Sequence, residues 1–149
     1  MTAKEFLRQY EYAERRIRRL EKEYEEERIL IDAIRSTSDN DGMPHGNSIS
    51  KPTEDRAIKL ADRHMKLVEA RLEAIEIRQQ VFEVIDKVHG VEGDVLYERY
   101  INLRKWEDIC VMLNFSWRGI HKIHGKALGV VQDRLDQERV HRSAHSLSV

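Results

Sequence analysis

The sequence predicts an all-α protein in which a long N-terminal antiparallel helical hairpin precedes a C-terminal helix-turn-helix domain. Two long segments repeat apolar residues in steps of three and four, and a stretch rich in Gly, Pro, Asn, Asp and Ser separates them. After Gly93 the apolar repeats become short. We therefore expect a coiled-coil-like hairpin over residues 1–90, a helix-turn-helix domain over 91–137 and a flexible tail over 138–149.

The first long helix is predicted from Phe6 onward. Its apolar residues form a heptad seam that only Glu27 interrupts, and the other positions carry mainly Arg and Glu. The seam consists of Phe6, Tyr10, Ala13, Ile17, Leu20, Tyr24, Ile31 and Ile34. Residues 36–52, with the sequence STSDNDGMPHGNSISKP, lack periodicity and are predicted to form a loop that is longer than most connections.

The second long helix is predicted after Pro52, with Thr53 as its N-cap. Its predicted seam is Ile58, Ala61, Met65, Val68, Leu72, Ile75 and Phe82, with Gln79 as a polar break. Gly90 and Gly93 are expected to end or kink this helix. The two seams can pack against each other within one chain or pair between subunits, because periodicity does not distinguish these arrangements.

Three shorter helices are predicted over residues 94–102, 105–114 and 116–135. Each has a short set of apolar residues that can face a common core. These inner residues are expected to be Val95, Leu96, Tyr100 and Ile101, then Ile109, Met112 and Leu113, then Ile120, Ile123, Leu128 and Val131.

The residues between the second and third short helices fit the demands of a helix-turn-helix motif. Cys110, four positions after Trp106, supplies a small side chain where the two helices cross. Asn114 tolerates the left-handed backbone conformation that a tight turn requires. Phe115 can fill the turn, and Ser116 can cap the next helix. The motif predicts a DNA-reading helix that starts at Ser116.

The distribution of charge supports the same interpretation. Residues 104–126 contain five basic and two acidic side chains, a net charge of +3, in a chain whose total is −1. With Ile120 and Ile123 facing inward, the basic side chains of the third helix face outward. The predicted DNA-binding residues are Arg104, Lys105, Ser116, Trp117, Arg118, His121, Lys122 and Lys126.

These residues are expected to have different tasks on double-stranded DNA. Arg118 can donate two hydrogen bonds to a guanine, and Ser116 with the free amides of the helix start can bind a phosphate. Lys122 and Lys126 suit further phosphates. His121 is also expected at a phosphate, whereas Arg104 and Lys105 are expected at the flanking backbone. Trp117 either touches a thymine methyl or a sugar, or packs on the preceding helix.

The segment VLYERYINLRKWEDICVMLNFSWRGIHKIHGKAL resembles the region-4-like helix-turn-helix of sigma factors. Together with MTAKEFLRQ and GMPHGNSISKPTEDRA, it resembles small transcriptional regulators of the RinA/ArpU type, encoded by phages of Gram-positive bacteria. The resemblance implies activation of late phage genes in the host cytoplasm, with the helix from Ser116 reading the promoter. Family members often have Ala where this chain has Cys110 and Gly where it has Asn114, and both departures are mild.

Two other functions remain open from the sequence. One is a sigma-like adaptor that binds RNA polymerase, and the other is the DNA-recognition (small) subunit of a phage packaging terminase. A homo-oligomer is expected, and a dimer is favoured because two half-sites add affinity and specificity to one small motif.

The sequence does not predict an enzyme, a metal site or a cofactor. It contains no Gly-rich phosphate loop, no nucleophile elbow and no recognisable Ser/His/Asp spacing. His121 with His124 and His141 with His145 have chelating spacing, but neither pair has a third ligand at motif spacing. The single cysteine excludes an internal disulfide, and no secretory signal or membrane-spanning stretch is present. We therefore expect a cytoplasmic protein that does not bind membranes.

Overall fold

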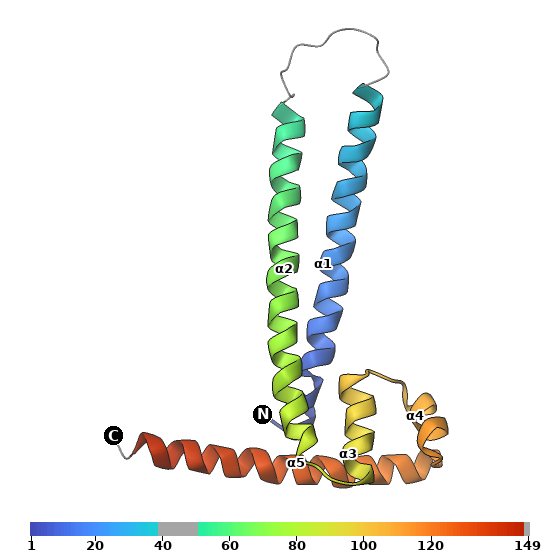
Figure 1. Ribbon diagram of the computed structural model, residues 1–149, viewed down its shortest axis with the longest axis vertical. Helices are drawn as coiled ribbons and strands as arrows, with labels where there is room; N and C mark the ends of the chain where they lie inside the picture. The colour runs from blue at the N-terminus through green and yellow to red at the C-terminus, as the bar shows by residue number, and fades with distance from the viewer. Residues whose placement is uncertain (39–50, 148–149) are drawn as a thin grey trace. The chain divides into compact units, whose positions relative to one another are not determined.

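The computed structural model describes residues 1–38 and 51–147, and every regular element within these ranges is a helix (Figure 1). The elements are α1 Ala3–Ser38, α2 Lys51–Asp86, α3 Val91–Leu96, the π-helix η1 Tyr97–Ile101, α4 Trp106–Leu113 and α5 Trp117–Ser146. The all-α prediction is confirmed. None of the helices in the described ranges combines the length and the apolar character needed to cross a bilayer.

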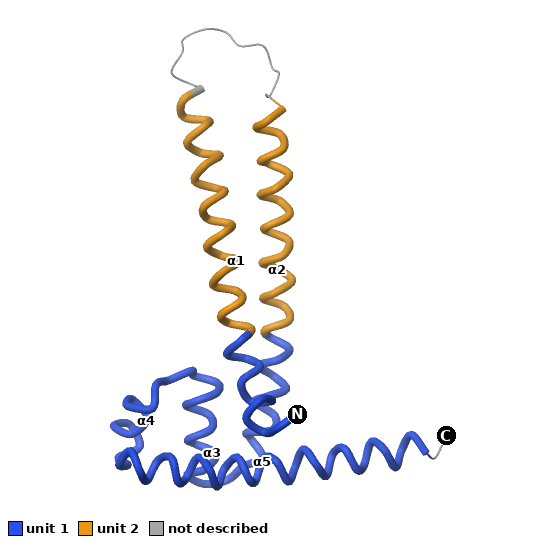
Figure 2. Tube along the Cα trace, turned by 180° about the vertical axis from the view of Figure 1, so that it is seen from behind, with its two compact units in different colours: residues 1–12, 75–149 blue, residues 13–74 orange. Residues whose placement is uncertain are grey.

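Two compact units make up the chain (Figure 2). Unit 1 comprises Met1–Tyr12 and Ile75–Val149, and unit 2 comprises Ala13–Ala74. Unit 1 therefore contains the start of α1 and the end of α2 in addition to all the later helices. This division differs from the domain boundaries expected at residues 90 and 137. The reason is that the first turns of α1 and the last turns of α2 contribute apolar side chains to the core of unit 1.

Unit 2 consists of the α1 and α2 segments packed against each other, which confirms the predicted antiparallel hairpin. Its core joins Ile17 of α1 to Leu67, Ala70 and Ala74 of α2. Ala13, Leu20 and Tyr24 pack against this core. The predicted seam of α1 is thus on the packed side, except that Ile34 near its end is exposed.

The prediction of which face of α2 packs against α1 is wrong. Ile58, Met65, Leu72 and Ile75 are 57%, 56%, 63% and 66% exposed, whereas the buried residues of α2 in unit 2 follow a second series. The helix carries two apolar series, and the one that packs on α1 contains Ala70 and Ala74. Small side chains let two helix backbones approach closely, which physically explains why α1 lies on this face.

The ends of the hairpin also differ from the prediction. The expected loop began at residue 36, but Ser36 and Thr37 belong to α1, and both hydroxyls donate to the carbonyl of Ala33. At the other end α2 already starts at Lys51, so Thr53 lies within the first turn and is not the N-cap. Proline is well tolerated in a first turn because its missing N–H has no intrahelical partner there. The rest of the predicted loop, residues 39–50, lies outside the described residues.

Unit 1 surrounds a core to which α1, α2, α3, η1 and α5 contribute. Its buried residues are Ala3, Leu7, Val81, Val84, Ile85, Val88, Leu96, Tyr100, Ile101, Ala127 and Val131. The turn from α2 to α3 depends on two glycines, as predicted. Gly90 has a φ of +80°, and a Cβ on Gly93 would lie 2.0 Å from the Val88 carbonyl oxygen.

The three predicted short helices are present. The first spans α3 and η1, and the π-turn is marked by the Asn102 amide, which donates to the Tyr97 carbonyl oxygen over 3.1 Å. The inner faces are largely as expected. Met112 is an exception because it is 44% exposed, whereas Phe115 from the following turn packs against the core.

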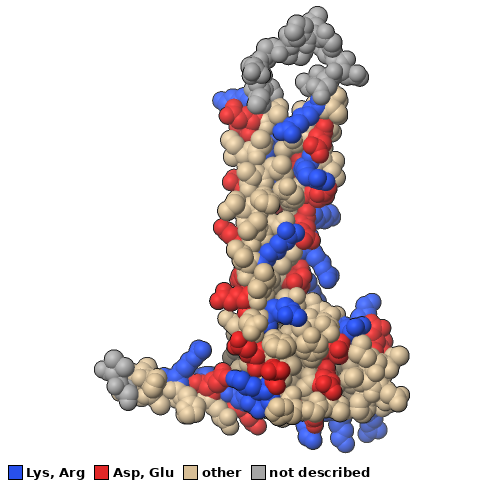
Figure 3. All heavy atoms as spheres, in the orientation of Figure 1, with Lys and Arg blue, Asp and Glu red and all other residues tan. Residues whose placement is uncertain are grey.

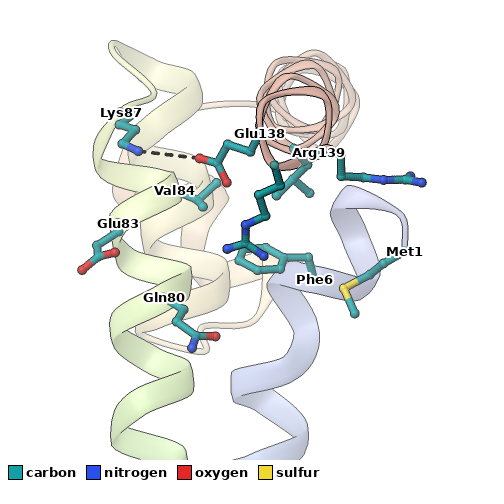
Figure 4. A pocket seen from close by; sticks show the side chains of 10 residues that line it. Met1, Phe6, Gln80, Glu83, Val84, Lys87, Glu138 and Arg139 are labelled. Carbon is teal, nitrogen blue, oxygen red and sulfur yellow. Dashed lines mark ion pairs between the residues drawn. The ribbon is translucent and has the colours of Figure 1, made fainter. Parts of the chain in front are cut away.

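Within the expected tail, α5 continues as a helix through Ser146. Its second half is attached to the end of α2. The Arg134 guanidinium donates to the Lys87 carbonyl oxygen over 2.7 Å, and Lys87 Nζ lies 3.8 Å from Glu138 Oε1. Figure 4 shows this ion pair beside an open pocket of about 600 Å³, which Phe6 and Arg139 help to line. Glu138, the first residue of the expected tail, therefore has a partner at the end of α2.

Candidate nucleic-acid interface

The helix-turn-helix motif is formed by α4, the turn Asn114–Ser116 and the start of α5. Ile109 of α4 and Ile120 of α5 are fully buried together with Val95 of α3. Around them pack Trp106, Cys110, Leu113, Phe115 and Ile123. The pairing of Ile120 and Ile123 with α4 is the one that the spacing predicted, and it fixes which side of α5 faces inward.

The turn has the local geometry that its residues predicted. Asn114 adopts the left-handed conformation, with φ 59° and ψ 46°, and the Phe115 amide donates to the Cys110 carbonyl oxygen over 3.0 Å. Ser116 caps α5, because its hydroxyl oxygen accepts from the Gly119 amide over 3.1 Å. A Cβ at Gly119 would lie 3.0 Å from that hydroxyl oxygen, so glycine keeps the cap uncrowded.

Arg118 and Lys122 are exposed on the outer side of α5. Neither forms an ion pair with any residue that the structure describes. Figure 3 shows Lys and Arg atoms projecting along the edge of the molecule formed by the first half of α5. Lys105, directly before α4, is also exposed. These three cations are free to meet an anionic partner.

Two other predicted cations already have carboxylate partners. Lys126 Nζ lies 3.4 Å from Glu92 Oε1, and Arg104 Nε lies 2.7 Å from Glu98 Oε2. Hydrogen bonds from the backbone amide of Glu92 and from Lys126 lower the pKa of Glu92. In both pairs the cation is the more exposed partner, and the carboxylate side chains are 25% and 17% exposed. The exposed side of each cation is open to a phosphate.

The aromatic residues of the motif form a connected cluster. The His121 ring lies 4.7 Å from the Trp106 ring and 4.6 Å from the Trp117 ring, measured between centroids. Trp117 remains exposed on its other side, while Trp106 packs on the motif's core and beneath the guanidinium of Arg99. His121 is half-buried between the two indoles, so it is less exposed than Arg118 and Lys122.

His124 is a residue to which sequence reasoning assigned no role. It was considered only as a possible metal partner of His121, but it is buried and its Nε2 lies 2.8 Å from the hydroxyl oxygen of Tyr100. Burial, with a smaller contribution from Lys4, lowers the pKa of His124 to about 4. Burial likewise raises the pKa of Tyr100 to about 12. The spacing Ile120, His124, Ala127, Val131, which is one helical stripe, was the available signal.

Sequence reasoning also missed three cations beside the motif. Lys4, Arg8 and Arg99 line a pocket of about 190 Å³ together with Trp106 and His121, and Glu11 also borders it. The described residues contain no group of three or more side chains placed to hold a metal ion. Comparisons of the chain with protein-family models, curated proteins and solved structures found no match.

Proposed function

We propose that the protein is a sequence-specific, double-stranded-DNA-binding transcriptional regulator that reads the major groove with the start of α5. One observation carries the proposal. The apolar side of α5, around Ile120, is buried against α4, and this leaves Arg118 and Lys122 exposed and unpaired directly after a capped tight turn. Helix-turn-helix proteins present the N-terminal residues of the second helix to base edges in the same way.

The proposed contacts follow from the chemistry of each group. The Arg118 guanidinium matches the two acceptors of guanine, O6 and N7, and so gives sequence preference. Lys122, one turn further, neutralises a phosphate. The first amides of α5 have no intrahelical acceptors and favour a phosphate near Ser116. Lys126 and Arg104 exchange their surface carboxylates for phosphates.

The biological role that fits this reader is activation of late genes in a phage, as in the RinA/ArpU type of regulator. We place the protein in the host bacterial cytoplasm as a homo-oligomer, with a dimer as the simplest form. This assignment supplies the promoter as the target and RNA polymerase as a possible second partner.

A sigma-like adaptor that binds RNA polymerase is the second candidate. Val111 and Met112, neighbours on α4, are 83% and 44% exposed. Exposed neighbouring apolar side chains on a small motif favour a protein partner. In this alternative α4 provides the contact surface, and the basic face of α5 contributes only to attraction.

The deciding experiment is selection of bound duplexes by the full-length protein, followed by anisotropy titrations with two variants. Arg118→Ala is expected to cost about 1–3 kcal/mol on the selected site and to relax base preference at one position. Lys122→Ala is expected to weaken binding to all sequences alike and to lower the salt slope by about one. Lys66→Ala, which removes an exposed cation of unit 2, is the matched control and should bind like the wild type.

The outcomes separate the two candidates. If selection enriches no sequence, and if both α5 variants bind every duplex as the wild type does, α5 is not a reader and the proposal fails. A double variant, Val111→Ser with Met112→Ser, that loses polymerase binding while duplex binding stays unchanged would then support the adaptor.

A further inference from the structure

One face of α2 carries an apolar stripe without a partner among the described residues. In heptad notation, Ile58, Met65 and Leu72 occupy position a, and Ala61, Val68 and Ile75 occupy position d. Four of these six side chains are more than half exposed, and Val68 is half-buried. We call these six residues the α2 stripe. A strict 3-4 repeat of this length is the pattern of a helix that pairs with another helix.

The α2 stripe is separate from the surface that packs on α1. Leu67, Ala70 and Ala74, which pack on α1, occupy positions c and f of the same heptads. At 3.6 residues per turn the c/f face and the a/d face are about 150–160° apart. The α2 helix therefore presents two seams on nearly opposite sides, and α1 occupies only one of them.

The charges beside the α2 stripe show what kind of helix fits there. Every e position along it is acidic, and every g position along it is arginine or histidine. The e residues are Asp62, Glu69 and Glu76, and the g residues are His64, Arg71 and Arg78. A helix with one edge acidic and the other basic is complementary to a second copy of itself.

We infer that the α2 stripe is the interface of a homodimer in which the α2 helices of two copies form a parallel coiled coil. In a parallel pair each g residue faces an e residue of the next heptad in the partner copy, so His64 meets Glu69 and Arg71 meets Glu76. An antiparallel pair would bring g against g and e against e, which places like charges opposite each other. The charge pattern therefore selects the parallel orientation.

The residues next to the stripe tolerate this arrangement. Arg71 already donates to Glu21 Oε1 within the chain over 2.8 Å, but both side chains are about half exposed. The guanidinium has five donors, so it can bind Glu21 and a partner carboxylate together. Gln79 follows at the next a position, and a polar a residue fixes register in coiled coils. Parallel pairing also brings the carboxyl ends of the two α2 helices to the same end of the coiled coil.

The first test measures the mass of the full-length protein by sedimentation equilibrium without DNA. The wild type is expected to have the mass of two chains, and Leu72→Glu the mass of one. Ile29→Glu is the matched control, because Ile29 lies on α1 and is 57% exposed, close to the 63% of Leu72. It is expected to remain dimeric. Any wild-type mass other than two chains, or dissociation of Ile29→Glu while Leu72→Glu stays dimeric, would overturn the inference.

The second test measures orientation and does not depend on a destabilising variant. The single cysteine allows a Cys110→Ala background, into which Ile58→Cys or Leu72→Cys is introduced. In a parallel, in-register pair each new cysteine lies beside its own copy, so both variants are expected to form disulfide-linked dimers on mild oxidation. These positions are about 21 Å apart along the helix, so an antiparallel pair could align at most one of them with itself.

Ile29→Cys in the same background should stay uncrosslinked. Crosslinking of only one α2 variant, or of neither, would reject the parallel coiled coil. The inference gives an interface to the dimer expected of a DNA reader, but neither experiment contains DNA. A failure of DNA binding therefore leaves these results unchanged, and the absence of a dimer leaves the reading role of α5 to its own test.

Discussion

The pair formed by His124 and Tyr100 joins α5 to the core of unit 1. Both side chains are buried, their polar atoms lie 2.8 Å apart, and the rings stack with centroids 5.8 Å apart. A protonated imidazole at this place would lose hydration next to the cations Lys4 and Arg99, and for this reason the histidine stays neutral in the folded protein.

This neutral histidine makes stability depend on pH. The pKa of His124 is about 4 in the folded chain, against 6.5 for an unperturbed histidine. Below pH 6.5 the unfolded chain therefore binds a proton that the folded chain does not, so acid lowers the free energy of unfolding. Between pH 7 and pH 5 we expect a loss of roughly 2 kcal/mol from this residue.

The measurement is chemical denaturation at several pH values in this window, compared with His124→Gln. The glutamine keeps a polar partner for the Tyr100 hydroxyl but does not titrate, so its stability should change less between pH 7 and pH 5. A pH dependence identical to that of the wild type would show that His124 has the same pKa in the folded protein as in the unfolded chain.

Single-residue predictions from the sequence succeeded where the cause is local. Asn114 and Ser116 have their turn and cap roles because of their own backbone preferences and side-chain oxygens, and both act within three residues. The role of His124 could not be predicted because its partner, Tyr100, lies 24 residues away along the chain. The ion pairs of Lys126 and Arg104 with Glu92 and Glu98 likewise depend on how the short helices meet.

At the level of the element, the seam of α1 contains one buried charge. Glu27 is 4% exposed and lies 3.3 Å from Arg56 and 3.8 Å from Lys59, both of which remain partly in solvent. The carboxylate thus bears the cost of desolvation while the two cations keep much of their hydration. Such an arrangement contributes little stability relative to an apolar side chain of similar volume.

We therefore expect opposite effects from two substitutions at this position. Glu27→Gln removes both ion pairs but leaves a buried amide, so the free energy of unfolding should fall by about 1–3 kcal/mol. Glu27→Leu continues the apolar seam, and because Arg56 and Lys59 can turn to water, stability should be unchanged or higher by up to about 2 kcal/mol.

Denaturation followed by circular dichroism checks this order. Glu25→Gln, which affects an exposed pair with Arg28 in the same helix, should leave stability close to that of the wild type. If Glu27→Leu were less stable than Glu27→Gln, the carboxylate would be a net stabilising element of the hairpin.

Helix α2 shows that periodicity can predict a helix without predicting which of its faces is packed. The existence and approximate length of the helix follow from its 3-4 repeat, but the residues Leu67, Ala70 and Ala74 form a second repeat of the same period. The series predicted to pack, which includes Ile58, Met65 and Leu72, has larger apolar side chains, and for this reason the sequence favoured it. The choice depends on which face lets α1 approach closely, and this is a property of the pair of helices rather than of either sequence alone.

For the whole molecule, the distribution of charge predicts that one copy of the proposed DNA-binding surface binds a duplex weakly on its own. The net charge of the chain is −1, whereas the segment 104–126 carries +3. Acidic side chains elsewhere repel a duplex, so attraction is confined to a small area that can neutralise only a few phosphates. Two linked copies double the number of phosphate contacts and convert the second binding step into an intramolecular one.

A variant that cannot dimerise should therefore bind DNA poorly although its reading residues are intact. Leu72→Glu is expected to reduce affinity for the selected site by about 10²–10⁴-fold, the gain that linked binding usually supplies. The slope of log K against log salt should fall to about half, because it scales with the number of phosphates neutralised. Anisotropy titrations at several salt concentrations measure both quantities, with Ile29→Glu as the variant expected to match the wild type. If Leu72→Glu is monomeric by sedimentation and still shows the wild-type slope, one copy makes all the phosphate contacts, because no partner remains to share them. Regulation would then depend on a monomer reading a single promoter element rather than on two symmetric half-sites.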